Sequence, residues 1–121
     1  MIILFNRIFY IGMLKALFGN STAEKVLLYI ANYGDGHING IARTFGISPS
    51  QVQKQLIRLE SGGILVARTF GNTRIFSMNP RWAFREELLK LLEKTLLRLP
   101  GEDIKKYFRQ RTRPRRTGKE M

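Results

Sequence analysis

The polar side chains between residues 48 and 58 are the part of this sequence best suited to chemistry. They are Ser48, Ser50, Gln51, Gln53, Lys54 and Arg58. Val52, Leu56 and Leu59 recur among them at helical spacing, which predicts a helix that buries one face and exposes these polar groups. Hydroxyl, amide and basic side chains on an exposed helix can reach phosphates or base edges in the major groove of DNA. The chemistry predicted for this segment is therefore recognition by hydrogen bonding and charge.

Residue types that support catalysis or metal binding are scarce. The 121 residues include no cysteine and a single histidine, His37, so thiol chemistry, disulfides and metal sites rich in Cys or His are not expected. The sequence holds no paired carboxylates, no nucleophile beside a base and no phosphate-binding loop. It therefore predicts a protein with no cofactor and no enzymatic activity. The lack of cysteine also fits the cytoplasm, where we expect the protein to work.

The excess of positive charge lies in two blocks. The formal net charge is +12, of which residues 37–81 contribute +5 and residues 105–121 contribute +7. Residues 82–104 between the two blocks carry a net charge of −1. A polyanionic partner would account for both blocks. The alternative is that the charge serves only to keep the protein soluble.

A helix-turn-helix is predicted to position the polar helix. Ala42 precedes Gly46 by four positions and Val52 by ten. A small residue at position 42 allows two helices to cross closely, and the glycine supplies the freedom for a tight turn. Ser48 followed by Pro49 predicts the start of the second helix, because the hydroxyl caps free amides and proline suits the first helical position.

The elements on either side of this unit are predicted from similar local patterns. Ser21 with Glu24 three positions later forms a capping-box pattern, so a core helix is expected to begin there and to end at Gly34. Residues 37–38 are expected to form a very short strand, after which Asn39 caps the next helix. Beyond the polar helix, residues 64–70 and 73–78 alternate as β-strands around a tight turn at positions 71–72.

From about residue 19 to residue 82, the sequence resembles winged helix-turn-helix regulators of the broad ArsR-like class. The resemblance rests on residues 41–80, IARTFGISPSQVQKQLIRLESGGILVARTFGNTRIFSMNP, including the junction from Leu56, Leu59 and Glu60 into the hairpin. It implies a mainly α fold with a small β-hairpin, in which the helix at 48–61 enters the major groove of double-stranded DNA. The hairpin at 64–78, the wing, is implied to lie on the DNA backbone or in the minor groove. The wing residues implied in contact are Arg68, Thr69, Asn72, Thr73 and Arg74.

The resemblance leaves part of the function open. The sequence departs from the metal-sensing members of the class because it has no cysteine, so metal induction is not expected. Winged helices also serve as protein-binding modules. The alternative to a transcriptional regulator is therefore a winged-helix interaction or RNA-binding module in a larger complex.

Residues 1–18 are predicted to form an amphipathic helix that packs on the domain or on a second subunit. Asn6, Arg7 and Lys15 interrupt the apolar run, so neither a membrane-spanning helix nor a signal peptide is expected. An interfacial membrane helix is an alternative for this segment. Met13 is an alternative start of the natural chain.

Two functions are predicted for the C-terminal region. Residues 83–100 are expected to form a helix whose leucines pair two copies into a homodimer, with folding back over its own domain as the alternative. The leucines with suitable spacing are Leu89, Leu92, Leu96 and Leu99. Residues 101–121 are expected to be a basic tail, largely disordered beyond about Arg109, that contacts phosphates or, alternatively, binds RNA or an acidic protein. The tail arginines assigned to phosphate are Arg109, Arg111, Arg113, Arg115 and Arg116.

Overall fold

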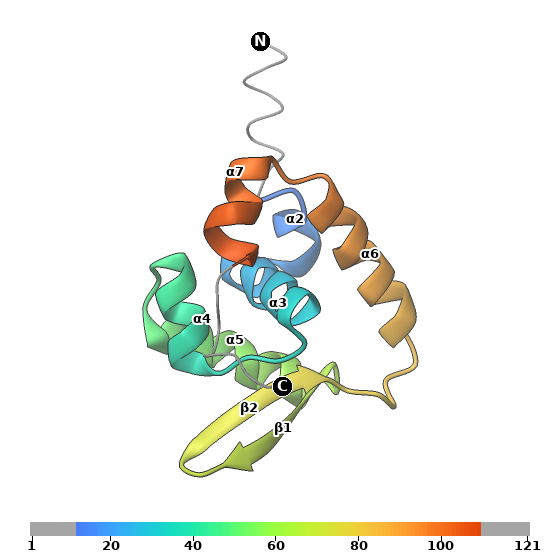
Figure 1. Cartoon of the computed structure of the whole chain (residues 1–121). Coiled ribbons are helices and arrows are strands. Elements are labelled where there is room, and N and C mark those ends of the chain that lie inside the picture. The colour runs from blue at the N-terminus through green and yellow to red at the C-terminus, as the bar shows by residue number, and fades with distance from the viewer. Residues whose placement is uncertain (1–11, 110–121) are drawn as a thin grey trace, which may run out of the picture.

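Helix α3, Ser21–Tyr33, is the central element of the computed structural model, which describes residues 12–109. It packs against α2, α4, α5, α6, β2 and η1, and its buried side chains form much of the single hydrophobic core (Figure 1). The helix is capped by Asn20, whose Oδ1 accepts a hydrogen bond from the backbone N–H of Ala23 at 2.7 Å. The prediction that Ser21 caps this helix was therefore wrong by one residue.

Glu24 does not complete a capping box, because its side chain is turned into the core. It is fully buried, and its Oε2 accepts hydrogen bonds from the backbone N–H groups of Gly12 at 3.1 Å and Leu14 at 2.8 Å. This carboxylate fixes the turn that leads into α2, Lys15–Phe18. Of the amphipathic helix predicted for residues 1–18, α2 falls within the described residues, and residues 1–11 lie outside them.

The helix-turn-helix consists of α4, Ile38–Phe45, and α5, Pro49–Ser61. Gly46 has a φ of 68° and ends α4 in the left-handed conformation, as predicted. The Ser48 hydroxyl accepts a hydrogen bond from the backbone N–H of Gln51 at 3.3 Å, which confirms the predicted cap. The buried side chains of α5 are Val52, Leu56 and Leu59, also as predicted.

The segment before α4 differs from the prediction. Gly36, rather than residues 37–38, pairs with Phe76 through two backbone hydrogen bonds of 2.9 and 2.8 Å. The α4 helix then begins directly at Ile38, so His37 occupies the cap position and Asn39 lies within the first turn.

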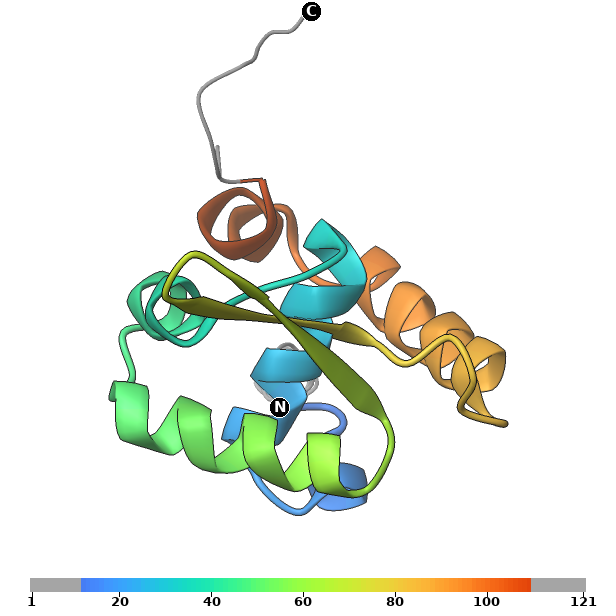
Figure 2. The ribbon, with the colours of Figure 1, turned by 90° about the horizontal axis from the view of Figure 1, so that it is seen from below.

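The wing consists of β1, Leu65–Phe70, and β2, Thr73–Met78. The strands are antiparallel, from the pair Leu65↔Met78 to the pair Phe70↔Thr73 beside the turn. Gly71 at that turn has a φ of 66°, the conformation that a tight hairpin turn requires. Figure 1 shows the hairpin at one edge of the domain, below α4 and α5, and Figure 2 shows it from that side.

The C-terminal region folds back over the domain. Helix α6, Arg85–Leu97, packs along α3 and is followed by α7, Gly101–Asp103, and the π-helical turn η1, Ile104–Phe108. Phe108 is buried, and its carbonyl oxygen accepts a hydrogen bond from the Asn32 side chain at 2.8 Å. The predicted boundary of the tail at residue 101 is therefore wrong, because residues 101–108 are helical and packed on the domain. Within residues 12–109, no helix is long and apolar enough to cross a membrane.

Candidate nucleic-acid interface

The outward face of α5 carries a group of exposed polar side chains. They are Ser50, Gln51, Gln53 and Lys54. They stand in the first two turns of the helix, opposite the buried side chains of Val52 and Leu56. Ser48 is also exposed, but its hydroxyl is occupied in capping the helix and lies 3.3 Å from the Ser50 hydroxyl. The structure thus brings these predicted contacts together on one face, with Ser48 in a structural role.

Arg58 lies on the side of α5 that meets the N-terminal segment. Its Nη2 donates a hydrogen bond to the Phe18 carbonyl oxygen at 3.1 Å, and its Nε donates to Gln55 Oε1 at 2.9 Å. The Phe18 carbonyl belongs to the last residue of α2, where the free carbonyl groups of a helix attract a cation. In this structure Arg58 connects α5 to α2 instead of extending from the polar face.

Both arginines of the wing form ion pairs with carboxylates of the same chain. Arg74 Nη2 lies 2.7 Å from Glu60 Oε2 on α5, and its guanidinium lies 5.0 Å from the centre of the Phe76 ring. Arg68 Nη2 lies 3.4 Å from Asp35 Oδ2 in the turn after α3. The two arginine side chains remain 50% and 62% exposed, so a phosphate could still approach them. Thr69, Asn72 and Thr73 are exposed around the turn of the hairpin.

Three exposed apolar residues on these elements were missed by the sequence analysis. Ile57 on α5 is 46% exposed, Val66 on β1 is 36% exposed, and Phe70 beside the wing turn is 77% exposed. The sequence held a signal for Ile57, which follows Lys54 by three positions and so shares a side of the helix with it. Hydrophobic character alone would instead assign such a residue to the core.

The start of the basic tail is fixed beside the helix-turn-helix. The rings of Phe45, the last residue of α4, and Tyr107 stack with centroids 5.2 Å apart, and the Tyr33 hydroxyl donates to the Tyr107 carbonyl at 2.6 Å. Arg109 follows Tyr107 by two positions and is exposed. The other four arginines assigned to phosphate contacts, at positions 111, 113, 115 and 116, lie outside the described residues.

The four leucines proposed to pair two copies do not share one outer face. Leu92 is fully buried and Leu99 is 7% exposed, because both belong to the core of the chain itself. Leu89 and Leu96 are partly buried against the same core. The alternative, in which the helix folds back over its own domain, accounts for Leu92 and Leu99. Leu97, at 87% exposed, is the leucine of α6 that does face outward.

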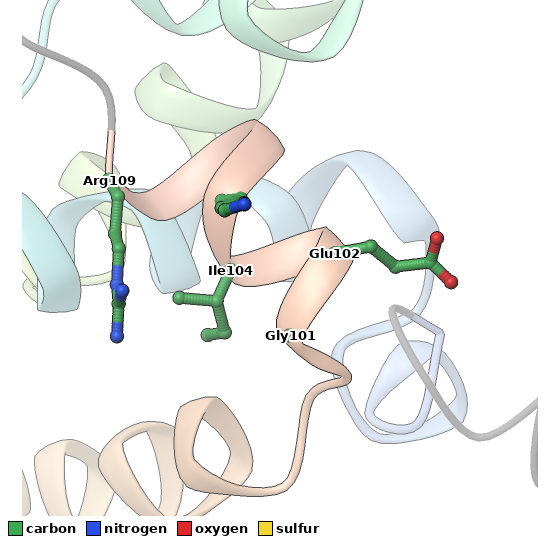
Figure 3. Close-up of a pocket in the computed structure, with 5 residues that line it drawn as sticks. Gly101, Glu102, Ile104 and Arg109 are labelled. Carbon is green, nitrogen blue, oxygen red and sulfur yellow. The ribbon is translucent and has the colours of Figure 1, made fainter.

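A surface hollow beside the C-terminal turns has no features of a catalytic or metal site. Gly101, Glu102, Ile104, Lys105 and Arg109 line it, and Figure 3 shows Glu102 pointing away from it. Nearby, burial raises the pKa of the Asp103 carboxyl, and the negative charge of Glu102 raises it further. Among residues 12–109, no group of three His, Asp or Glu side chains could hold a metal ion.

Among residues 12–109, the buried Tyr29 is the second group with a clearly shifted pKa. Burial raises the pKa of its phenol, and the neighbouring Tyr33 ring, at a centroid distance of 4.6 Å, adds to the increase. Tyr29 also makes an edge contact with Phe45, with centroids 6.3 Å apart. A neutral phenol is therefore favoured within the packing that supports α4.

A helix-turn-helix followed directly by an antiparallel hairpin defines this chain as a winged helix-turn-helix protein, as predicted. No protein-family model and no curated protein matches the sequence. The chain is similar to the crystal structure of the AntR antimony-specific transcriptional repressor, with a TM-score of 0.54 and 28% identity, over 70% of this chain and 72% of that one. It also shares its fold with reduced AbfR bound to DNA, with a TM-score of 0.54 and 21% identity, over 84% of this chain and 74% of that one. These similarities confirm the resemblance to winged-helix transcriptional regulators, whereas the ArsR-like class stays a prediction.

Proposed function

We propose that this chain binds double-stranded DNA in a sequence-specific manner and acts as a homodimeric transcriptional regulator. The observation that carries the proposal is the polar outward face of α5, which stands beside a basic wing. In this arrangement α5 enters the major groove and the wing lies on the backbone or in the minor groove. The similarity to a transcriptional repressor and to a regulator bound to DNA supports the same function.

The exposed residues of α5 suit different groups of the DNA, because their side chains differ in chemistry. The amides of Gln51 and Gln53 can each donate and accept, so they suit base edges such as those of adenine. Lys54 suits a guanine edge or a phosphate. Ser50, at the start of the helix, is placed to bond a phosphate where backbone N–H groups also point outward. The specificity of the protein would therefore depend mainly on the two glutamines and Lys54.

A homodimer is part of the proposal because one recognition helix reads only a few base pairs. Two copies related by a two-fold axis would read two half-sites about 34 Å apart, one turn of the DNA helix. We further propose that the protein works in the cytoplasm and has no catalytic activity.

The test is a set of matched titrations. The wild-type chain is measured against duplex DNA, single-stranded DNA and duplex RNA at one salt concentration, with the preferred duplex obtained by selection from random sequence. Tight binding limited to a subset of duplex DNA is expected. The double variant Gln51→Ala/Lys54→Ala should lose roughly 1 to 3 kcal/mol for each base that the helix no longer contacts.

The control variant is Lys94→Ala, which removes one positive charge from the exposed side of α6. It should leave both affinity and sequence preference almost unchanged. If the Gln51→Ala/Lys54→Ala variant also kept its affinity and preference, the interface would have to lie elsewhere. If the wild type preferred duplex RNA, the proposal would be replaced by an RNA-binding module.

A further inference from the structure

Ile57 is an apolar side chain exposed on the face of α5 that we propose lies against DNA. It follows Lys54 by three positions and precedes Glu60 by three, so the three residues share one side of the helix. Glu60 bonds to Arg74 of the wing, which places this side of α5 toward the wing. Ile57 therefore lies on the polar outward face of the helix, at the side that meets the hairpin, with 46% of its surface exposed.

Packing in the core does not account for an isoleucine at position 57. The inward side of α5 is already filled by Val52, Leu56 and Leu59, which are 0 to 5% exposed. One exposed isoleucine is also much smaller than the apolar patches that bind other proteins, which cover several hundred Å². A partner that offers a single small apolar group would fit it better.

The major groove offers one such group. Base edges there present hydrogen-bond donors and acceptors, and the C5 methyl group of thymine is the apolar exception. Apart from Pro49 at its first position, the remaining exposed residues of the helix are hydroxyl, amide and basic side chains suited to the polar groups. Contact with a thymine methyl would remove both apolar surfaces from water.

We infer that Ile57 is a specificity-determining residue that contacts the C5 methyl group of one thymine in each half-site. The inference rests on the proposed function, because it assumes that α5 lies in the major groove. Ile57 is seven residues beyond Ser50, a distance of about 10 Å along the helix at 1.5 Å per residue. For a helix that runs along the groove, at about 3.4 Å per base pair, this corresponds to roughly three base pairs between the thymine and the position that Ser50 approaches.

The experiment removes the methyl group without changing any hydrogen bond. Each thymine of the selected duplex is replaced in turn by deoxyuridine, and the Kd is measured for the wild type, Ile57→Ala and Ile57→Val. At one thymine per half-site the wild type should lose affinity about fourfold, the equivalent of one buried methyl group. Ile57→Ala should bind the thymine and deoxyuridine duplexes equally, and Ile57→Val should show a smaller difference than the wild type.

The matched control is Leu17→Ala, which trims another exposed aliphatic side chain, 64% exposed on α2. It should discriminate thymine from deoxyuridine as the wild type does. The inference is overturned if the wild type tolerates every replacement, or if Ile57→Ala keeps the full discrimination. If no duplex DNA is selected at all, the proposed function fails first. Duplex binding without an effect of the methyl group would reject the role of Ile57 alone.

Discussion

Arg74 of the wing donates a hydrogen bond to Glu60 of α5, with 2.7 Å between Nη2 and Oε2. The two residues are 14 positions apart in sequence and belong to the two elements proposed to contact DNA. The ion pair holds the hairpin and the helix at a fixed distance, and it places a carboxylate beside the arginine that a phosphate would approach. Glu60 therefore positions Arg74 and competes with DNA for it.

Replacing Glu60 by Gln is predicted to raise the affinity for DNA of any sequence. The substitution removes the competing negative charge, so Arg74 becomes available to a phosphate. The slope of log affinity against log salt should become steeper by about 0.9, the value for one phosphate contact. Stability should fall by less than about 1 kcal/mol, because exposed ion pairs contribute little.

The control for this prediction is Glu60→Gln combined with Arg74→Ala, which should abolish the gain in affinity and the change in slope. Fluorescence titrations at four or five salt concentrations would measure both quantities. An unchanged slope in the Glu60→Gln variant would show that Glu60 does not compete with phosphate for Arg74.

The helix-turn-helix and the wing could be predicted because their signals are local. Ser48 and Pro49 specify the start of a helix, and Gly71 with Asn72 specifies a tight hairpin turn, whatever the rest of the chain does. The partners of Arg58 and Arg68 could not be predicted in this way, because they lie 40 and 33 residues away in sequence. Such pairs depend on how the elements pack, and sequence spacing carries no information about that.

Two sequence-based predictions were wrong for the same reason, because both segments pack against other elements of the fold. The spacing of Glu24 from Ser21 fits a capping box. Its carboxylate instead accepts a hydrogen bond from the backbone N–H of Leu14, in the turn before α2, and α2 packs onto α3. The segment after residue 100 was assigned to a basic tail because of its charge. Its aromatic residues Tyr107 and Phe108 instead complete the packing around Phe45.

Replacing Phe108 by Ala is predicted to destabilise the fold. The side chain is 4% exposed and lies in the core, so its loss leaves a cavity and should cost about 3 kcal/mol or more in the free energy of unfolding. Urea unfolding followed by circular dichroism would measure this cost. Phe84→Ala is the control, because that ring is 62% exposed. Equal stability of the two variants would contradict the packed position of Phe108.

Replacing Leu92 by Glu is predicted to unfold the chain rather than merely to separate subunits. Leu92 is fully buried among the side chains of the core, where an unpaired charge is costly. Leu97→Glu should preserve the fold, because that side chain is exposed. If α6 forms the proposed dimer interface, Leu97→Glu should also yield monomers.

Sedimentation equilibrium at micromolar concentration, with circular dichroism for the fold, separates these outcomes. Val66→Glu on the wing is the control for Leu97→Glu, since it adds the same charge at another exposed apolar position. A wild-type chain that is monomeric under these conditions would contradict the proposed homodimer.

Truncation after Phe108 is predicted to weaken binding to every DNA sequence alike. It removes six Lys or Arg residues and keeps the packed residues that end with Phe108. Phosphates carry no base identity, so the order of preference among duplexes should survive while each affinity falls. The salt slope should become shallower by about 0.9 for each phosphate that the tail engages in the full chain, so three engaged arginines would change it by about 3.

The comparison that decides this prediction uses the truncated and full-length chains on one preferred duplex, one random duplex and one RNA duplex. The stacking of Tyr107 on Phe45 fixes the start of the tail beside α4, which favours DNA next to the helix-turn-helix as its partner. Unfolding curves of the two chains should coincide, because the truncation leaves the core intact. An unchanged salt slope on both DNA duplexes, together with a weaker affinity for RNA, would assign the tail to an RNA partner instead.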